Sequence, residues 1–196
     1  MKKTLPNNAI LIPDNAKLVF KGKIFDVYQW PQKMYDGSSS TFEMLKRPDS
    51  VEIIPIIDDN IIVTEEEQPD SPDSFYATPG GRHDVEGETT LQAAKRELLE
   101  ETGMKFKNWK LIQVFQPAPK IEHFVYRFIA TDFESQTDQE LDSGEKIKIL
   151  KLNLQEVKKL CDSPRAKYLQ KDIFSQVNSI NDLLNLPEFV GQEVDR

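Results

Sequence analysis

The segment that most constrains the fold is residues 89–102, because it has a clear helical period and a defined signal at each end. Its apolar side chains recur on one stripe of a helix: Leu91, Ala94 and Leu98. Thr89 and Gln92 match a capping box at the start, and Gly103 stands where a left-handed residue often ends a helix. The sequence therefore predicts a helix with fixed boundaries.

The segments on either side of this helix have the apolar, β-branched and aromatic character of strands. We predict strands at residues 17–30, 41–45, 51–57, 61–66, 107–116, 122–131 and 146–152. Asp58-Asp59-Asn60 joins the third and fourth of these as a hairpin. Asn153 with Glu156, and then Ser163-Pro164, predict the starts of two closing helices.

This arrangement predicts an α/β protein in three parts. Residues 1–46 form an N-terminal antiparallel strand unit, residues 47–162 form the main domain, and residues 163–196 form a C-terminal helix and tail that pack on the core. A chain of 196 residues is long enough for one packed domain and such an accessory unit.

Charge and cysteine content exclude several classes of protein. The formal charge of −8, from 33 acids against 25 bases, argues against a binder of nucleic-acid backbone, which usually has a clustered basic surface. Cys161 is the single cysteine, so the chain has no intrachain disulfide and no cysteine-based zinc site. The apolar run at residues 9–12 ends at Pro13 and no segment reaches membrane-spanning length, so we expect a cytoplasmic protein without a membrane partner.

An acidic cluster closes the predicted helix. Glu97, Glu100 and Glu101 fall within about 100° of arc beside the apolar stripe, at the edge of the core. Acids at a helix C-terminus are disfavoured by roughly 0.3 to 1 kcal/mol each, and neighbouring like charges repel further. A bound divalent cation would remove both penalties. Oxygen ligands alone favour Mg²⁺ or Mn²⁺.

Residues 78–104, "TPGGRHDVEGETTLQAAKRELLEETGM", resemble the Nudix box of the Nudix hydrolase family, written G-x5-E-x7-R-E-U-x-E-E-x-G-U with U a bulky aliphatic residue. The matching positions are Glu88, Arg96, Glu97, Leu98, Glu100, Glu101, Gly103 and Met104. The glycine at the start of the pattern departs from this spacing. Gly81 precedes Glu88 by seven residues, where the family has six, so this loop is one residue longer.

The resemblance implies an α/β/α sandwich around a mixed sheet and a role for each matching residue. It implies that Glu97 and Glu101 bind the catalytic cation, with Glu100 beside them and Glu88 as a further ligand or supporting acid. The carbonyl group of Gly80 would complete the ligands. Arg96 would orient the carboxylates, as a guanidinium fork can.

The implied reaction is hydrolysis of a phosphoanhydride in a nucleoside diphosphate linked to another moiety, giving a nucleoside monophosphate and a phosphorylated product. An acid must accept the proton of the attacking water. Some family members use the box helix for this step and others use a later loop. In this chain the placement of Glu145, just before the strand at 146–152, most resembles that of the loop acid in the ADP-ribose pyrophosphatase branch.

Features outside the box also resemble ADP-ribose pyrophosphatases, namely the N-terminal strand unit and Pro119 in "FQPAPK". Tyr28 and Trp30 are candidates to stack on the base. That branch commonly has Gln-x-Arg after the hairpin, where this chain has Gln68-Pro69-Asp70. The cations left to balance a diphosphate are Arg82, Lys120 and Arg127.

The sequence leaves three functions open. The intact acidic box favours a hydrolase over a binding module. The resemblance outside the box implies ADP-ribose or a nucleotide sugar as the substrate, and the related branch implies a homodimer that shares its N-terminal strands. A Nudix hydrolase of nucleoside triphosphates or dinucleotides would have the same box. A Nudix-fold module that senses a nucleotide without cleaving it is the third, and fold alone does not separate them.

Overall fold

The computed structural model describes residues 2–195, which divide into two compact units. The strand unit contains the residues up to Ser50, Val114–Tyr126 and the residues from Val190 onward; the core unit contains Val51–Gln113 and Arg127–Phe189. The boundaries fall within strands β5, β9 and β11 and before the C-terminal tail. The three-part division expected from the sequence stays a prediction.

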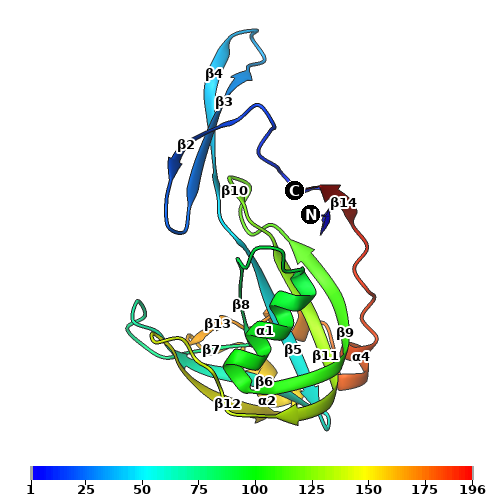
Figure 1. Cartoon of the computed structure of the whole chain (residues 1–196). Helices are drawn as coiled ribbons and strands as arrows, with labels where there is room; N and C mark the ends of the chain where they lie inside the picture. The colour runs from blue at the N-terminus through cyan, green and yellow to red at the C-terminus, as the bar shows by residue number, and fades with distance from the viewer. Residues whose placement is uncertain (1, 196) are drawn as a thin grey trace. The chain divides into compact units, whose positions relative to one another are not determined.

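Six strands belong wholly to the strand unit. They are β1 (Lys2–Leu5), β2 (Lys17–Lys21), β3 (Asp26–Lys33), β4 (Ser39–Lys46), β10 (Ile121–Glu122) and β14 (Gln192–Asp195). One sheet has the order β10-β4-β3-β2, and β1 pairs antiparallel with β14 in a separate two-stranded sheet, so the two ends of the chain meet (Figure 1). Ile12, Trp30 and Met44 form the small core of this unit.

The strand expected over residues 17–30 is two strands, β2 and β3, joined by a tight turn. Gly22 donates its N–H to the carbonyl of Phe25 at 3.1 Å and to Oδ1 of Asp26 at 3.2 Å. A side-chain carbon on Gly22 would lie 2.3 Å from the Phe25 oxygen, so glycine is required where the backbone closes. The single strand was therefore wrong at residues 22–25.

The remaining elements form or continue into the core unit. They are β5 (Asp49–Ile57), β6 (Asn60–Glu67), β7 (Phe75–Ala77), β8 (Gly80–His83), α1 (Thr90–Thr102), β9 (Met104–Phe115), β11 (Val125–Gln136), β12 (Lys146–Leu152), α2 (Leu154–Leu160), β13 (Ala166–Tyr168), α3 (Lys171–Phe174) and α4 (Ile180–Leu184). Their sheet has the order β13-β7-β6-β5-β11-β9, with β12 pairing with β6 and β8 with β5. This is the mixed α/β fold that the sequence predicts.

The predicted hairpin of β5 and β6 is confirmed. Asp58 and Asp59 occupy the left-handed region with φ of 49° and 61°, which suits a tight two-residue turn. Ile54, Ile56, Ile61 and Val63 pack with the buried residues of α2 and α3. Because successive side chains of a strand alternate between faces, Thr64 and Glu66 lie on the opposite face of β6 from Val63.

Helix α1 is confirmed with both of its predicted ends, and it lies beside β8 (Figure 1). Thr89 and Gln92 form the capping box, and Gly103 at φ 70° donates its N–H to the Leu99 carbonyl at 2.7 Å. A side-chain carbon on Gly103 would lie 2.0 Å from the Thr137 oxygen. Close packing and backbone conformation together fix the last turn of α1.

The first closing helix is confirmed as α2, with Asn153 as its N-cap. The second, predicted to start at Ser163-Pro164, was wrong, because this segment turns and then continues as β13. The N–H of Tyr76 donates to the carbonyl of Arg165 at 2.8 Å, so the open edge of β7 competes successfully with the helix signal. No helix within residues 2–195 has the length and apolar character needed to cross a membrane.

Candidate active site

The C-terminal half of α1 places a buried carboxylate against the glycine loop. Glu101 is 5% exposed, and its Oε2 accepts the N–H of Gly80 at 2.9 Å. Burial raises the pKa of Glu101 well above its usual range, and the charges of Glu66, Glu97 and Glu145 raise it further, while the Gly80 N–H lowers it. The site therefore contains concentrated negative charge.

Glu66 is the site residue that the sequence analysis missed. It is 6% exposed and accepts the hydroxyl of Thr64 at 2.6 Å. Burial raises its pKa, and the charge of Glu145 adds to this. The available signal was the alternation along β6, which puts Glu66 on the same inward face as Ile62 and Thr64.

Arg96 holds the outer carboxylates in one fork. Its Nε and Nη2 donate to the two oxygens of Glu88 at 3.0 and 3.1 Å, and its Nη1 donates to Glu97 at 2.7 Å and to Glu100 at 3.1 Å. Nη2 also donates to the carbonyl of Arg82 at 2.9 Å. Glu88, the strongest of these partners, holds the pKa of Arg96 above its usual range. The structure thus gathers the predicted Glu88, Arg96, Glu97 and Glu100 at one place.

The longer glycine loop still delivers Glu88 to Arg96. The additional residue is absorbed in a turn, in which Glu88 donates its N–H to the Val85 carbonyl at 3.3 Å and Gly87 has φ of 82°. His83 Nε2 lies 2.6 Å from the Glu88 carbonyl oxygen and ties the two ends of this turn. The change in spacing therefore leaves the carboxylate within the cluster.

Two glycines allow the close approach of this loop to its neighbours. A side-chain carbon on Gly80 would lie 2.2 Å from the Val51 oxygen, and one on Gly81 would lie 2.2 Å from Oε2 of Glu97. At Gly80 the neighbour is backbone, so only glycine fits there, whereas a side chain at Gly81 would displace the carboxylate of Glu97. The loop backbone thus lies directly against the acidic helix end.

The donor set of this cluster fits a hard divalent cation, since it offers carboxylate oxygens that raise one another's pKa. Within residues 2–195, no group of three His, Cys, Asp or Glu side chains stands ready as a complete metal site. Arg96 and the Gly80 N–H hold the carboxylates instead. The assignments of Gly80, Glu88, Glu97, Glu100 and Glu101 as ligands stay predictions.

Glu145 lies close enough to the cluster for its charge to raise the pKa of Glu66, Glu97 and Glu101. It is half-buried just before β12, where its Oε2 accepts the N–H of Asp142 at 3.3 Å. A loop acid that faces the buried carboxylates is suited to exchange a proton with a reacting group between them.

The predicted substrate residues are dispersed. In the strand unit, Trp30 is 9% exposed with its ring centroid 6.0 Å from that of Phe42, so it packs in a core; Tyr28 is half-buried beside it, and Pro119 is exposed. In the core unit, Arg82 is exposed, with Nε 3.4 Å from Asp84. Their contacts with substrate stay predictions.

Each of the three candidate cations for a diphosphate has a partner. Arg127 is 9% exposed and donates to Glu52 at 2.6 Å and to Asp172 at 2.7 Å. The amine of Lys120, in the strand unit, lies 4.5 Å from the centroid of the Phe42 ring. Arg82 belongs to the glycine loop and is exposed beside Asp84.

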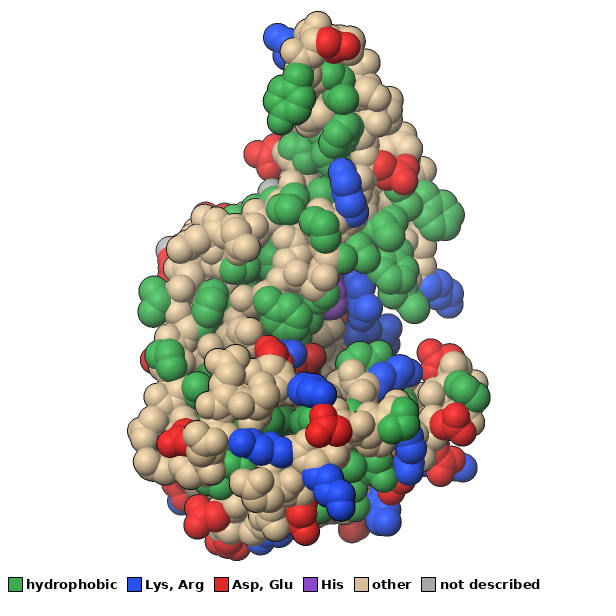
Figure 2. Space-filling model, turned by 180° about the vertical axis from the view of Figure 1, so that it is seen from behind, with side chains coloured by type: hydrophobic (Ala, Val, Ile, Leu, Met, Phe, Trp, Pro, Cys, Tyr) green, Lys and Arg blue, Asp and Glu red, His purple; other side chains and the backbone are tan. Residues whose placement is uncertain are grey.

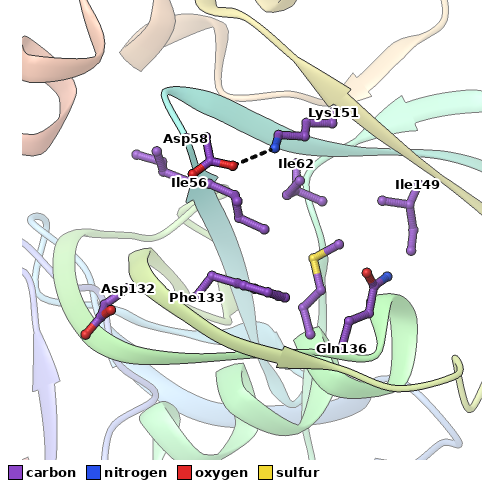
Figure 3. A pocket seen from close by; sticks show the side chains of 10 residues that line it. Ile56, Asp58, Ile62, Asp132, Phe133, Gln136, Ile149 and Lys151 are labelled. Atoms are coloured by element: carbon purple, nitrogen blue, oxygen red, sulfur yellow. Dashed lines mark hydrogen bonds and ion pairs between the residues drawn. The ribbon is translucent and has the colours of Figure 1, made fainter.

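Two hollows are lined by described residues of the core unit. The larger, of about 730 Å³, lies near the β5–β6 turn and is drawn in Figure 3, where Lys151 pairs with Asp58 at 3.1 Å and Ile62 and Phe133 line the space from opposite sides. None of the clustered acids lines it. The smaller, of about 500 Å³, includes Glu145 in its wall.

Comparisons with known proteins agree with this geometry. The family model described as NUDIX domain matches residues 46–172. ADP-ribose pyrophosphatase of Bacillus subtilis (strain 168) is 28% identical over 148 residues, covering 74% of this chain and 80% of the relative. Methanol dehydrogenase activator of Bacillus methanolicus is 24% identical over 141 residues, covering 70% and 76%. A crystal structure described as ADP compounds hydrolase has a TM-score of 0.64 and 24% identity, covering 83% of this chain and 87% of the other.

Without divalent cations, the stability of the protein should fall as the pH rises. The folded state raises the pKa of Glu66, Glu97 and Glu101, so it binds more protons than the unfolded chain above the ordinary value of 4.5. Glu101→Gln should flatten this dependence and melt higher than wild type at mildly alkaline pH. Thermal unfolding in chelator from about pH 5 to 8 measures this.

The control for this experiment is Glu134→Gln, which removes an exposed acid from β11. Its melting curve against pH should run parallel to that of wild type. The same parallel curve for Glu101→Gln would contradict the assignment of a destabilising buried charge to Glu101.

Proposed function

Because the chain belongs to the NUDIX family, whose model covers residues 46–172, we propose that it hydrolyses a phosphoanhydride in a nucleoside diphosphate linked to another moiety, with a divalent cation as cofactor. The observation that carries this proposal is the buried carboxylate of Glu101, which lies against the Gly80 backbone among further acids. Such charge is costly without a positive ligand. The preferred substrates are ADP-ribose or a nucleotide sugar, and the products are a nucleoside monophosphate and a sugar phosphate.

The names of two similar proteins support this substrate class. One is an ADP-ribose pyrophosphatase and the other an ADP compounds hydrolase. A third similar protein is named as an activator of methanol dehydrogenase. The second candidate function is a nucleotide-sensing module without hydrolysis, and the experiments below distinguish the two.

Glu97 and Glu101 would hold Mg²⁺ or Mn²⁺, with Glu100, Glu88 and the Gly80 carbonyl as further ligands. When bound, the cation neutralises charge on the phosphate oxygens and favours ionisation of the attacking water. Arg96 fixes the outer carboxylates in its fork. Glu145 accepts the proton of the water, because it lies in the loop before β12, where its charge acts on the buried Glu101.

We also propose a cytoplasmic homodimer built on the strand unit. Strand β2 is exposed along its length, and five apolar side chains around it are at least 36% exposed: Leu18, Val19, Phe20, Ile24 and Phe25. Figure 2 shows hydrophobic side chains gathered on this part of the surface. An exposed apolar edge strand supports pairing with a second copy.

Product analysis tests the activity. We expect release of AMP from ADP-ribose that requires magnesium and is faster than cleavage of nucleoside triphosphates or dinucleotides. Faster cleavage of a nucleoside triphosphate or a dinucleotide would support the proposed reaction and contradict the proposed substrate. Magnesium-dependent binding of ADP-ribose without cleavage of any compound would support the sensing function.

Glu101→Gln should lower kcat by at least about a hundredfold, since it removes charge where the cation is held. It should also remove the rise in melting temperature that magnesium gives the wild type. Glu134→Gln is the matched control and should keep both properties. Near-normal turnover in folded Glu101→Gln would refute its assignment as a ligand.

Glu145→Gln should lower kcat by about 10² to 10⁴, the usual contribution of a general base. Magnesium should still raise its melting temperature, because the carboxylates of α1 remain. Glu140→Gln, which changes an exposed acid of the same loop, should retain activity. Equal activities for the two variants would exclude Glu145 as the base.

Phe20→Lys should convert a dimer to a monomer, because a charge would be buried in the paired edge. Light scattering after size exclusion should give twice the chain mass for wild type and for the control Val85→Lys, which changes an exposed valine of the core unit. A monomeric wild type would contradict the proposal.

A further inference from the structure

The smaller hollow lies next to the candidate active site and is formed by two loops, residues 67–74 and 143–146. The loops approach each other closely, because a side-chain carbon added to Gly144 would lie 3.6 Å from Pro69 Cγ. Glu145 belongs to the wall of the hollow, and Gln68 of the same wall donates its amide to the buried Glu66 at 3.4 Å. A group bound here would therefore be close to the reacting phosphates.

The charges of this wall are unbalanced. Three carboxylates line it, those of Glu67, Asp73 and Glu145, against one ammonium group, that of Lys146. Lys146 lies 3.3 Å from Glu67, so it is already paired. The wall as a whole is negative and would repel an anionic group.

Two cations that contact residues of or beside the wall already have partners. Arg165 donates to Glu65 and to the hydroxyl of Ser74, a residue of the wall. The amine of Lys167 lies 4.5 Å from the centroid of the Phe75 ring.

The neutral groups of the wall are hydrogen-bonding groups of small size. Ser71, Ser74 and Ser143 contribute hydroxyls, and Gln68 contributes an amide. Hydroxyls, amides and carboxylates together can donate to and accept from the hydroxyls of a sugar. A volume of about 500 Å³ has room for one ring of this kind.

We propose that this hollow receives the moiety attached to the second phosphate, and that it selects an uncharged, hydroxyl-rich group against one that carries a further phosphate. The proposal rests on the proposed function and adds a preference for the chemical class of the group attached to the second phosphate. Selection comes from repulsion by the acidic wall as much as from hydrogen bonds to the sugar.

The test compares ADP-ribose with ADP-ribose phosphorylated on its terminal ribose. We expect kcat/KM to be at least about fivefold higher for ADP-ribose at low salt, with a smaller ratio at high ionic strength, where charge repulsion is screened. Equal kcat/KM values, or a ratio that salt leaves unchanged, would overturn the proposal.

A variant with Glu67→Gln and Asp73→Asn should reduce the preference for ADP-ribose, mainly by lowering KM for the phosphorylated compound. Asp59→Asn is the control, because it removes an exposed acid at the β5–β6 turn, in a left-handed conformation that asparagine tolerates. An unchanged preference in the double variant would overturn the proposal. Loss of the preference in Asp59→Asn would also overturn the proposal, since the overall charge of the protein would then explain the preference.

Failure of the two proposals can be distinguished. If magnesium supports cleavage of neither compound, the proposed hydrolysis fails, and calorimetric binding of the same two compounds still tests the hollow. Tighter binding of ADP-ribose that weakens in the double variant supports the selection. Equal binding of both compounds overturns it.

Discussion

The interaction on which the site depends is the hydrogen bond from the Gly80 N–H to the buried carboxylate of Glu101. It joins the last turn of α1 to the start of β8, at residues that are 21 positions apart in the chain. Removing a carboxylate from water costs several kcal/mol, and a single N–H offsets part of that cost. The packing of α1 therefore leaves negative charge that is only partly compensated beside the glycine loop.

The arrangement of the other charged residues can be explained by this partly compensated charge. Arg96 neutralises the outer acids in a fork that also fixes the Arg82 carbonyl, so the loop and the helix are held by the same side chain. The hydrogen bonds of Arg96 go to the acids Glu88, Glu97 and Glu100. Glu101 and Glu66 remain buried with raised pKa values, and their position defines where positive charge is still required.

What the sequence predicted well depends on local chemistry. The boundaries of α1 come from Thr89, Gln92 and Gly103, and the hairpin comes from Asp58-Asp59, all within a few residues of the backbone groups that they stabilise. The helix signal at Ser163-Pro164 was equally local, but the edge of β7 is formed from residues far away in the chain. Pairing at such a distance leaves no signature in a short window of sequence.

Glu66 shows the same limit for the site. From the sequence alone, the run Glu65-Glu66-Glu67 predicts three solvent-exposed acids. In the structure, the side chains of β6 alternate between its two faces, and Glu66 points inward. Its burial against Glu101 would weaken a purely structural protein. A buried carboxylate that lowers the stability of the protein is most easily tolerated where a bound cation offsets its charge. The position of Glu66 therefore links the stability of β6 to the occupancy of the site.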